Sequence, residues 1–474
     1  MRLALTLSFI AACAAYGRDP NLIVIYADDQ GWGDLSSYGN PYIRTPRIDR
    51  MAAEGIRFTD FYAQPFCGPS RAALMTGAYP PRNSMMFNHL PRARTGIHAN
   101  EITLAELLKT RNYATMIIGK WHLGDAPPFL PTKHGFDKWL GLPYSNDMWP
   151  FHPKIEKHEH EDPRLTEIRK RAEMTGYQGQ GDIYPRNWFP DLPLMRDNDV
   201  VELNPDQTEL TKRYNREALD FITANRAKPF FLYLAHSMPH VPLHPSKEFA
   251  GRSLRGKYGD VIEEIDAGVG RLLDHVKSLG LDQDTLIVFT SDNGPWLHYG
   301  IDAGSAGPLR DGKGTLWEGG VRVPAVFRWP GKIPAGRVTS EIAANIYIYA
   351  TFAALAGAAL PKDRTLDSLN LWPFLSGQTA KSPRDVFYYY SGEVFYKATD
   401  GRPKHSSKLE AVREQRWKLW LTTGALYDLQ EDMGEKRDVA KFHPQVAARL
   451  RKMAEAFDAT LQRNVRPLGE LAAQ

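Results

Sequence analysis

The chain has 474 residues, of which 43% are hydrophobic and 24% charged, and its formal net charge is +4. This composition is typical of a folded globular protein, long enough for one large core with a smaller domain or for two or three ordinary domains. The small net charge excludes a nucleic-acid-binding signature, and after the N-terminus no apolar stretch is long enough for a transmembrane segment.

The first residues of the chain have the pattern of an export signal. Residues 1–15 contain one basic side chain, Arg2, followed by an apolar run and small residues. Two processing routes fit this pattern: cleavage after Ala15, or lipidation of Cys13 in a segment that resembles a bacterial lipobox. Because Cys13 comes early for a lipobox, we favour plain export to the periplasm or the extracellular space over a lipid anchor.

Four apolar runs along the chain share one design, a short stretch that ends abruptly in polar, reactive residues. We expect strands at residues 22–26, 114–118, 230–234 and 285–290. Continuous apolar runs are typical of strands buried on both faces, as in a parallel sheet.

Segments with apolar residues at helical spacing lie between these runs. They are 46–54, with Thr45 as the expected N-cap and Gly55 as the stop, and then 103–109, 208–225 and 261–279. The alternation predicts an α/β fold, a large mixed, mostly parallel sheet sandwiched by helices. Ligands bind beyond the carboxyl ends of such strands, so we expect the reactive ends of all four runs to converge on one site.

Residues 152–200 interrupt this alternation of predicted strands and helices, because they are rich in charged residues and proline. The run Lys157–Glu161, which alternates His and Glu, resembles a metal site, but a solvated loop or short surface helix explains it better. We interpret the segment as an insertion near the mouth of the pocket.

The sequence pattern changes again after about residue 375. Short strands separated by turns are expected at 386–390, 409–413, 417–421 and 426–429, and a helix at 444–461. These elements predict a smaller C-terminal antiparallel sheet with a packing helix. The expected division is therefore a signal peptide at 1–15, a larger domain at 20–375 and a C-terminal subdomain at 376–474.

Hard oxygen ligands follow two of the predicted strands. Asp28 and Asp29 close the first run, and Asp292 and Asn293 close the fourth. Such ligands favour Ca²⁺ or Mg²⁺ over zinc. The alternative is that these residues only begin turns. Two such pairs, each at the end of an apolar strand, favour a metal site.

Cys67 is the one cysteine that remains after removal of the N-terminal signal, so it cannot form an internal disulfide. It should therefore carry a free thiol or a chemically altered one. Cys67 begins the segment Cys67–Gly77, whose sequence is CGPSRAALMTG. The plainer alternative is a buried apolar cysteine at a helix start.

The segment Cys67–Gly77 resembles the sulfatase signature, in which the cysteine is oxidised to formylglycine. Further motifs that resemble this family occur in family order at 27–29, 119–124, 143–147, 239–242, 291–294 and 312–320. The chain is thus similar to the arylsulfatase A-like branch of the sulfatase family, within the alkaline-phosphatase superfamily, from about Asn21 to the C-terminal helix. Ala78 departs from the pattern, since the family often has Arg there, and we expect it to affect packing more than chemistry.

The resemblance implies a sulfuric ester hydrolase that acts on a sulfate monoester, with a carbohydrate as the expected substrate. A maturation enzyme would convert Cys67 to formylglycine, whose hydrate carries two hydroxyls. One hydroxyl attacks sulfur and displaces the alcohol, and deprotonation of the other reforms the carbonyl and expels sulfate. One Ca²⁺ per chain would be held by the following residues: Asp28, Asp29, Cys67, Asp292 and Asn293.

The resemblance also implies a role for each polar residue of the motifs. Lys120, Lys313 and Ser145 would contact the sulfate group, and Arg71 would steady the metal-bound hydroxyl. His240 would protonate the leaving alcohol, and His122 would deprotonate the spare hydroxyl. His236 lies near the same strand end but does not align with the acid position.

Aromatic side chains near the expected pocket mouth could stack on sugars, although exposed aromatics are also common on protein surfaces. They are Trp149, Trp188, Trp296 and His298. Two other functions stay open at this point. One is a phosphonate or phosphodiester hydrolase of the same superfamily, and the other is a catalytically dead protein that binds sulfated glycans.

Overall fold

The structure, a computed structural model, describes residues 18–472 apart from 158–160, 175–184, 186 and 396–403. The predicted export signal and Cys13 lie outside the described residues, as does most of the His- and Glu-containing run. Among the helices that are described, none is both long enough and apolar enough to cross a membrane.

Within the described residues, eleven strands form one large sheet. Its order is β11 (Arg337–Thr339), β2 (Ile56–Tyr62), β10 (Arg322–Arg328), β9 (Thr285–Ser291), β1 (Asn21–Ala27), β8 (Phe230–Ala235), β4 (Ala114–Gly119), β5 (Lys138–Gly141), β6 (Pro193–Arg196) and β7 (Asp199–Leu203), with β12 (Ala343–Ala344) beside β2. The four predicted strands, β9, β1, β8 and β4, are neighbours and run parallel. Antiparallel pairs flank them, since β10 pairs with β9 and β2, and β6 pairs with β5 and β7. The predicted mixed, mostly parallel sheet is confirmed.

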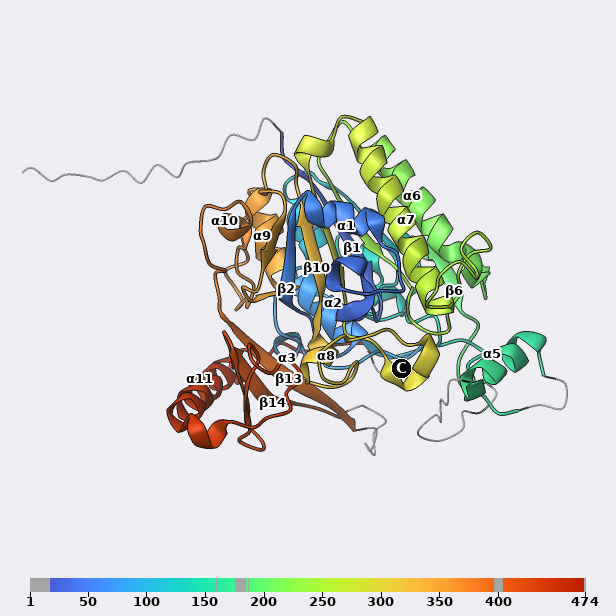
Figure 1. Cartoon of the computed structure of the whole chain (residues 1–474). Coiled ribbons are helices and arrows are strands. Elements are labelled where there is room, and N and C mark those ends of the chain that lie inside the picture. Colours follow the sequence, from blue (N-terminus) through green and yellow to red (C-terminus); the bar gives the residue numbers. More distant parts are fainter. Residues whose placement is uncertain (1–17, 158–160, 175–184, 186, 396–403, 473–474) are drawn as a thin grey trace, which may run out of the picture.

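Helices cover both faces of this sheet, because alternate residues of the central strands point to opposite sides. In β1, Leu22 and Val24 join one core and Ile23 and Ile25 join the other. The first core contains α2 (Cys67–Thr76), α4 (Leu104–Lys109) and α9 (Tyr347–Leu355), and the second contains α1 (Pro46–Ala53), α6 (Leu210–Ala224) and α7 (Lys257–Ser278). Figure 1 shows α6 and α7 side by side on the side of the molecule opposite α9.

The start of α1 differs from the prediction. Thr45 makes no capping hydrogen bond to the helix, and its hydroxyl instead contacts Ser36 and Asp49. The carboxylate of Asp266, in α7, accepts the backbone N–H groups of Arg47 at 3.0 Å and Ile48 at 2.8 Å. The backbone N–H groups at this helix end, which have no partner within the helix, are therefore satisfied by a side chain more than two hundred residues away. Local sequence does not reveal this contact.

The segment 152–200, interpreted from the sequence as an insertion, contains regular elements. These are α5 (Pro163–Met174), β6 and the start of β7, so the segment extends the main sheet at one edge. In Figure 1, α5 projects to the lower right, whereas α11 (Pro444–Gln462) lies at the lower left. The edge pair of β6 and β7 was not predicted, because these short strands have no continuous apolar run.

The C-terminal region forms the predicted small antiparallel sheet with a packed helix. The strands are β13 (Val386–Phe395), β14 (Lys404–Glu414), β15 (Trp417–Trp420) and β16 (Leu426–Asp428), and the helix is α11 (Pro444–Gln462). The chain then returns to the larger domain, where β17 (Gly469–Glu470) pairs with β3 (Thr95–Gly96). Three short helices complete the fold: α3 (Pro80–Asn83), α8 (Glu318–Val321) and α10 (Trp372–Leu375). A boundary between the two domains at 375 remains our proposal.

Candidate active site

Reactive side chains gather where the four central parallel strands end. These side chains are Asp28 and Asp29 after β1, Lys120 after β4, His240 in the loop after β8, and Asp292 and Asn293 after β9. Gly119 permits one of these turns, since its φ is +103° and a Cβ atom there would lie 1.8 Å from the carbonyl oxygen of Ala235. The backbone of Lys120 then donates to the same carbonyl at 2.8 Å, which fixes the direction of the turn.

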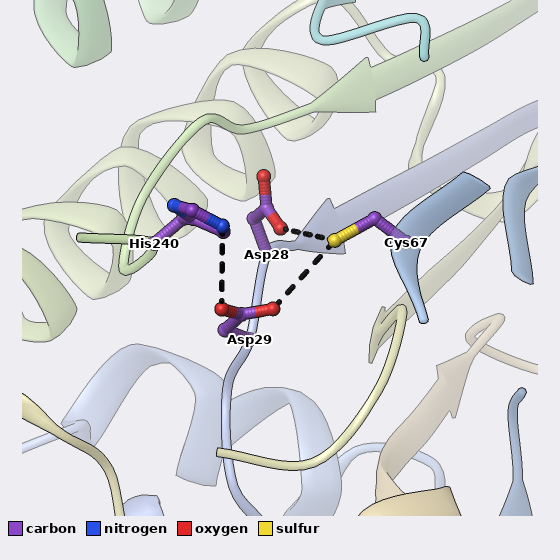
Figure 2. A group of neighbouring side chains, drawn as sticks. All are labelled: Asp28, Asp29, Cys67 and His240. Atoms are coloured by element: carbon purple, nitrogen blue, oxygen red, sulfur yellow. Dashed lines mark hydrogen bonds and ion pairs between the residues drawn. The ribbon is translucent and has the colours of Figure 1, made fainter. Parts of the chain in front are cut away.

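Cys67 is fully buried at the first turn of α2, facing the end of β1. Its Sγ lies 3.4 Å from Asp28 Oδ1 and 3.7 Å from Asp29 Oδ1, as Figure 2 shows. Burial and the negative charge of Asp292 raise the pKa of the Cys67 thiol well above its usual value, although Lys120 and Lys313 act in the opposite direction. The unmodified side chain is therefore a protonated thiol, which is a weak nucleophile.

Three buried cations surround these carboxylates. Lys120 Nζ lies 2.7 Å from Asp28 Oδ2, and Lys313 Nζ lies 2.8 Å from Asp29 Oδ2. Arg71 NH2 lies 2.7 Å from Asp292 Oδ2. Burial alone would lower the pKa of each lysine, but the adjacent carboxylates outweigh it and raise both values. Both ammonium groups therefore stay charged in a site from which water is largely excluded.

The donor set fits a hard divalent cation. Ligand atoms of Asp28, Asp29, Cys67 and His240 all lie within 4.8 Å of one another, although the sequence did not predict His240 as a ligand. Asn293 Nδ2 donates to Asp29 Oδ1 at 2.8 Å, while Asn293 Oδ1 is buried without a hydrogen-bond partner among the described residues. A buried amide oxygen without a donor beside several carboxylates is the kind of ligand group that Ca²⁺ takes.

Both carboxylate oxygens of Asp292 accept hydrogen bonds. Its Oδ1 accepts the backbone N–H of Asp29 at 3.0 Å, and its Oδ2 accepts from Arg71. Burial and the charge of Asp28 raise the pKa of Asp292, which reflects unrelieved repulsion between carboxylates. A cation at this position would relieve that repulsion.

His240 points a ring nitrogen at this cluster. Its Nδ1 lies 2.6 Å from the carbonyl oxygen of Val241, so Nδ1–H donates there and leaves Nε2 facing Asp29 and Ser145. Nε2 lies 3.5 Å from Asp29 Oδ2 and 3.2 Å from Ser145 Oγ, which itself lies 3.2 Å from Lys120 Nζ. Burial and the charge of Lys313 lower the pKa of His240 to about 4, so the ring is neutral before substrate binds.

The other two histidines differ in where they lie. His122 has a left-handed backbone with φ of +63°, and neither of its ring nitrogens has a partner among the described residues. Burial lowers its pKa well below the usual value. Its side chain lines the cavity described next, whereas His236, which is equally buried, does not line it.

A cavity of about 390 Å³, called here the first cavity, opens beside the cluster. Its lining includes the predicted residues His122, Ser145, His240, Trp296, His298 and Lys313. Trp149 lies instead in a neighbouring cavity, and Trp188 is 48% exposed and lines neither. Of the four aromatics predicted near the pocket mouth, Trp296 and His298 therefore line the first cavity.

The lining residues of the first cavity that were not predicted as site residues include Asn88 and Asp147. Asn88 Oδ1 accepts the backbone N–H of Gly68 at 2.7 Å and so holds the start of α2 in place. Asp147 lines the cavity from the motif at 143–147. No local signal marks Asn88, which lies in an irregular loop, whereas Asp147 could have been found as the acidic residue of that motif.

Known proteins resemble this chain along most of its length. A sequence profile of sulfatases matches residues 20–358, and a profile of the C-terminal part of N-sulphoglucosamine sulphohydrolase matches 311–462. The two matches overlap, so they do not place a boundary at residue 375. Bovine (Bos taurus) arylsulfatase A is 39% identical over 495 aligned residues, which cover 96% of this chain and 92% of that protein.

Two further known proteins are similar to most of this chain. The N-acetylgalactosamine-6-sulfatase of Canis lupus familiaris is 40% identical over 417 residues, which cover 85% of this chain and 74% of that protein. Among solved structures, the PsFucS1 sulfatase from Pseudoalteromonas sp. has a TM-score of 0.80 and 28% sequence identity. That match covers 96% of this chain and 93% of the other.

Proposed function

This chain belongs to the sulfatase family and is a sulfuric ester hydrolase, and we propose that it cleaves sulfate monoesters of carbohydrates by means of a formylglycine at position 67 and a bound Ca²⁺. The observation that supports this most is the setting of Cys67. Its sulfur faces two carboxylates, and Lys120 and Lys313 pair with those same carboxylates. One buried position therefore holds the residue to be modified, the carboxylates that suit a metal and the lysines that suit an anion.

Conversion of Cys67 gives the site a nucleophile that the buried thiol does not provide. Once hydrated, formylglycine supplies one hydroxyl to attack sulfur and a second whose deprotonation releases sulfate from the same carbon. The residue sits at the first turn of the ten-residue helix α2, whose N-terminal dipole favours an anion. We propose that a formylglycine-generating enzyme of the host carries out the conversion.

Oxygen ligands from two strand ends would hold the calcium ion together with residue 67. They are Asp28, Asp29, Asp292 and Asn293. The ion would lower the pKa of the attacking hydroxyl and offset the charge of the sulfate. Arg71 holds Asp292 with two hydrogen bonds, from Nε at 3.1 Å and NH2 at 2.7 Å, so this carboxylate is fixed before any ligand arrives.

The two lysines and Ser145 bind the sulfate group. Lys120 Nζ and Ser145 Oγ are 3.2 Å apart, and Lys313 enters from the loop before α8. Because all three are buried and already positioned, their dipoles and charges need little reorganisation as charge develops on the leaving oxygen.

Two of the cavity histidines, His122 and His240, move protons in this proposal. His240 protonates the leaving oxygen, because the negative charge of bound sulfate favours the charged imidazolium, which burial and the charge of Lys313 disfavour. His122 accepts the proton of the spare hydroxyl. Its low pKa keeps it neutral, and both of its ring nitrogens are free of other described partners.

The substrate class follows from the relatives. One is named an N-acetylgalactosamine-6-sulfatase and another an arylsulfatase, so we propose a sulfated sugar as the natural substrate and an aryl sulfate as a usable probe. Export to the periplasm or the extracellular space, where such polymers occur, is part of the same proposal.

Two measurements together test the proposed function. Mass spectrometry of the peptide that contains residue 67, from protein made in its native host, should show the aldehyde. The same preparation should hydrolyse 4-nitrophenyl sulfate faster than the corresponding aryl phosphodiester. Faster phosphodiester cleavage would assign the chain to that chemistry, and an unconverted thiol without turnover would indicate a sulfated-glycan binding protein.

A further inference from the structure

Trp296 lines the first cavity but has no part in the mechanism proposed above. Its side chain is half-buried, and it stands three residues after Asn293, in the segment that leaves β9. The sequence suggested that this indole stacks on a sugar, which requires an open ring face. The contacts of the ring indicate a different use.

Three side chains of the protein already surround the indole. Lys313 Nζ lies over the ring, 4.4 Å from its centre. The ring of His240 is 5.5 Å away at an interplanar angle of 59°, and the ring of Tyr299 is 4.8 Å away at 70°. A ring face that carries an ammonium group cannot also stack on a sugar, so the indole serves contacts within the protein.

The Lys313 ammonium lies between two groups that attract it in different ways. Asp29 Oδ2 is 2.8 Å from Nζ and forms an ion pair, while the indole attracts the cation through its π-electrons. The side chain of Lys313 is only 5% exposed, and cation–π attraction is strongest for a cation removed from water. An ammonium group has three N–H donors, so the pair with Asp29 leaves donors for a sulfate.

The backbone brings these two side chains together. The N–H of Lys313 donates to the carbonyl oxygen of Pro295, the residue before Trp296, at 2.9 Å. Gly312 permits this approach, because a Cβ atom there would lie 2.3 Å from the same carbonyl oxygen. The contact between ammonium and indole is therefore fixed by the meeting of two loops, and it does not depend on a freely moving surface lysine.

Loss of the indole would leave Lys313 with Asp29 as its one remaining partner of these two. The lysine side chain is long and flexible, and water would enter the space that the ring fills. The ammonium could then turn away from the position where it meets a sulfate oxygen. Affinity for the sulfate group should fall for that reason, whatever alcohol the sulfate is attached to.

We propose that Trp296 is a positioning residue that holds the Lys313 ammonium in place for the sulfate group, and that it is not a platform for a sugar. This inference rests on the proposed function, because it takes Lys313 as a residue that binds sulfate.

Binding of inorganic sulfate tests the inference, because this probe has no sugar that could stack. Calorimetric titration would use calcium-loaded Cys67→Ala protein as the parent. Adding Trp296→Leu should weaken sulfate binding about tenfold, which equals about 1.4 kcal/mol. Trp296→Phe keeps an aromatic face and should lose about threefold at most. Trp188→Leu changes an exposed indole that does not line the first cavity, and as the control it should leave the affinity unchanged.

A double-mutant cycle separates positioning from general support of the fold. Lys313→Gln removes the charge, while Lys120 and Ser145 remain to bind sulfate. In this background Trp296→Leu should change the affinity by less than about twofold, because the indole acts through the ammonium. A purely structural role would give a similar loss with or without the charge of Lys313.

The inference is overturned if Trp296→Leu leaves the sulfate affinity unchanged, if Trp296→Phe loses as much as Trp296→Leu, or if the loss persists in the Lys313→Gln background. A parent protein that binds no sulfate overturns it as well, since Lys313 would then hold no anion. Failure of the proposed function has a different signature, namely converted wild-type protein that does not hydrolyse 4-nitrophenyl sulfate. The titrations do not depend on that reaction.

Discussion

Lys418 Nζ lies 3.1 Å from Glu318 Oε1, and neither side chain has any exposed surface. Lys418 belongs to β15 of the C-terminal sheet, whereas Glu318 begins α8, directly after the loop that carries Lys313. Lys418 also donates to the carbonyl oxygen of Leu316 at 2.7 Å. The C-terminal sheet thus supports the segment that follows Lys313 through one buried ammonium group.

Replacement of Lys418 by alanine should destabilise the whole protein. Burial alone would raise the pKa of Glu318, but Lys418 and Arg413 lower it to about 2, so the carboxylate is ionised and depends on these partners. Removing one partner of a buried pair costs about 3–5 kcal/mol. Urea denaturation should show a loss of this size, while Lys408→Ala, an exposed site on β14, should change stability by less than about 0.5 kcal/mol. Equal losses would contradict the buried-pair argument.

The proposed mechanism needs two hydroxyls at position 67, and it therefore predicts different outcomes for two substitutions. Cys67→Ala should abolish turnover and leave the fold intact, because the side chain only loses a buried thiol. Cys67→Ser should react once at most, because a serine sulfate ester has no second hydroxyl to expel it. Mass spectrometry of the serine variant after incubation with an aryl sulfate should detect either no adduct or a stable sulfate adduct. Repeated turnover by this variant would exclude the proposed release step.

Calcium should stabilise the protein as well as activate it. Protein treated with EGTA should gain about 2.7 kcal/mol of unfolding free energy when free Ca²⁺ reaches 100 times its dissociation constant, since only the folded state offers the site. Asn293→Ala removes the unpartnered amide oxygen and should weaken this gain. Asn100→Ala, on an exposed loop, is the control. A thermal unfolding curve that is the same with and without Ca²⁺ would count against a metal site here.

The two histidines of the loop after β8 should behave differently. His240→Ala should reduce kcat by about 10²- to 10⁴-fold on a sugar sulfate, where the leaving alkoxide needs a proton. The loss should be smaller on 4-nitrophenyl sulfate, whose leaving group departs as a stable anion. His236→Gln should retain near wild-type kinetics on both substrates. If the loss at His240 is equal for both, its role is positioning rather than proton donation.

Acid should destabilise the fold partly through His134, which is buried and lines neither cavity. Burial lowers its pKa from 6.5 to about 4, so between these values the unfolded state binds a proton that the folded state does not. Its contribution to stability is complete above pH 6.5 and is lost as pH falls to 4, by about 1.4 kcal/mol per unit and about 3 kcal/mol in all.

The matching experiment compares unfolding free energies at pH 7 and pH 4. His134→Gln should lose about 3 kcal/mol less than wild type over this range, whereas His443→Gln, at an exposed position, should lose as much as wild type. If the two variants follow the same pH dependence, the buried ring of His134 is not the source.

Much of the fold could be predicted because its central strands are continuous apolar runs. β1, β4, β8 and β9 each follow that pattern, and they occupy the middle of the sheet. β2 and β10 were not predicted, because charged residues break their apolar pattern. Arg57 and Asp60 lie within β2, and Arg322 begins β10. These polar groups are satisfied by contacts such as the pair Arg322–Asp60 at 3.0 Å, which form only when the strands meet.

The sequence by itself determined which chemical groups are present and roughly where along the chain they stand, because apolar periodicity and short motifs are local properties. Only the tertiary structure decided that Asp28 pairs with Lys120 and Asp29 with Lys313, that Asp266 rather than Thr45 serves the start of α1, and that Trp149 faces a second cavity. Each of these depends on contacts between residues far apart in the chain. Burial then gives those contacts their strength, since charges and hydrogen bonds removed from water are screened far less than in solution.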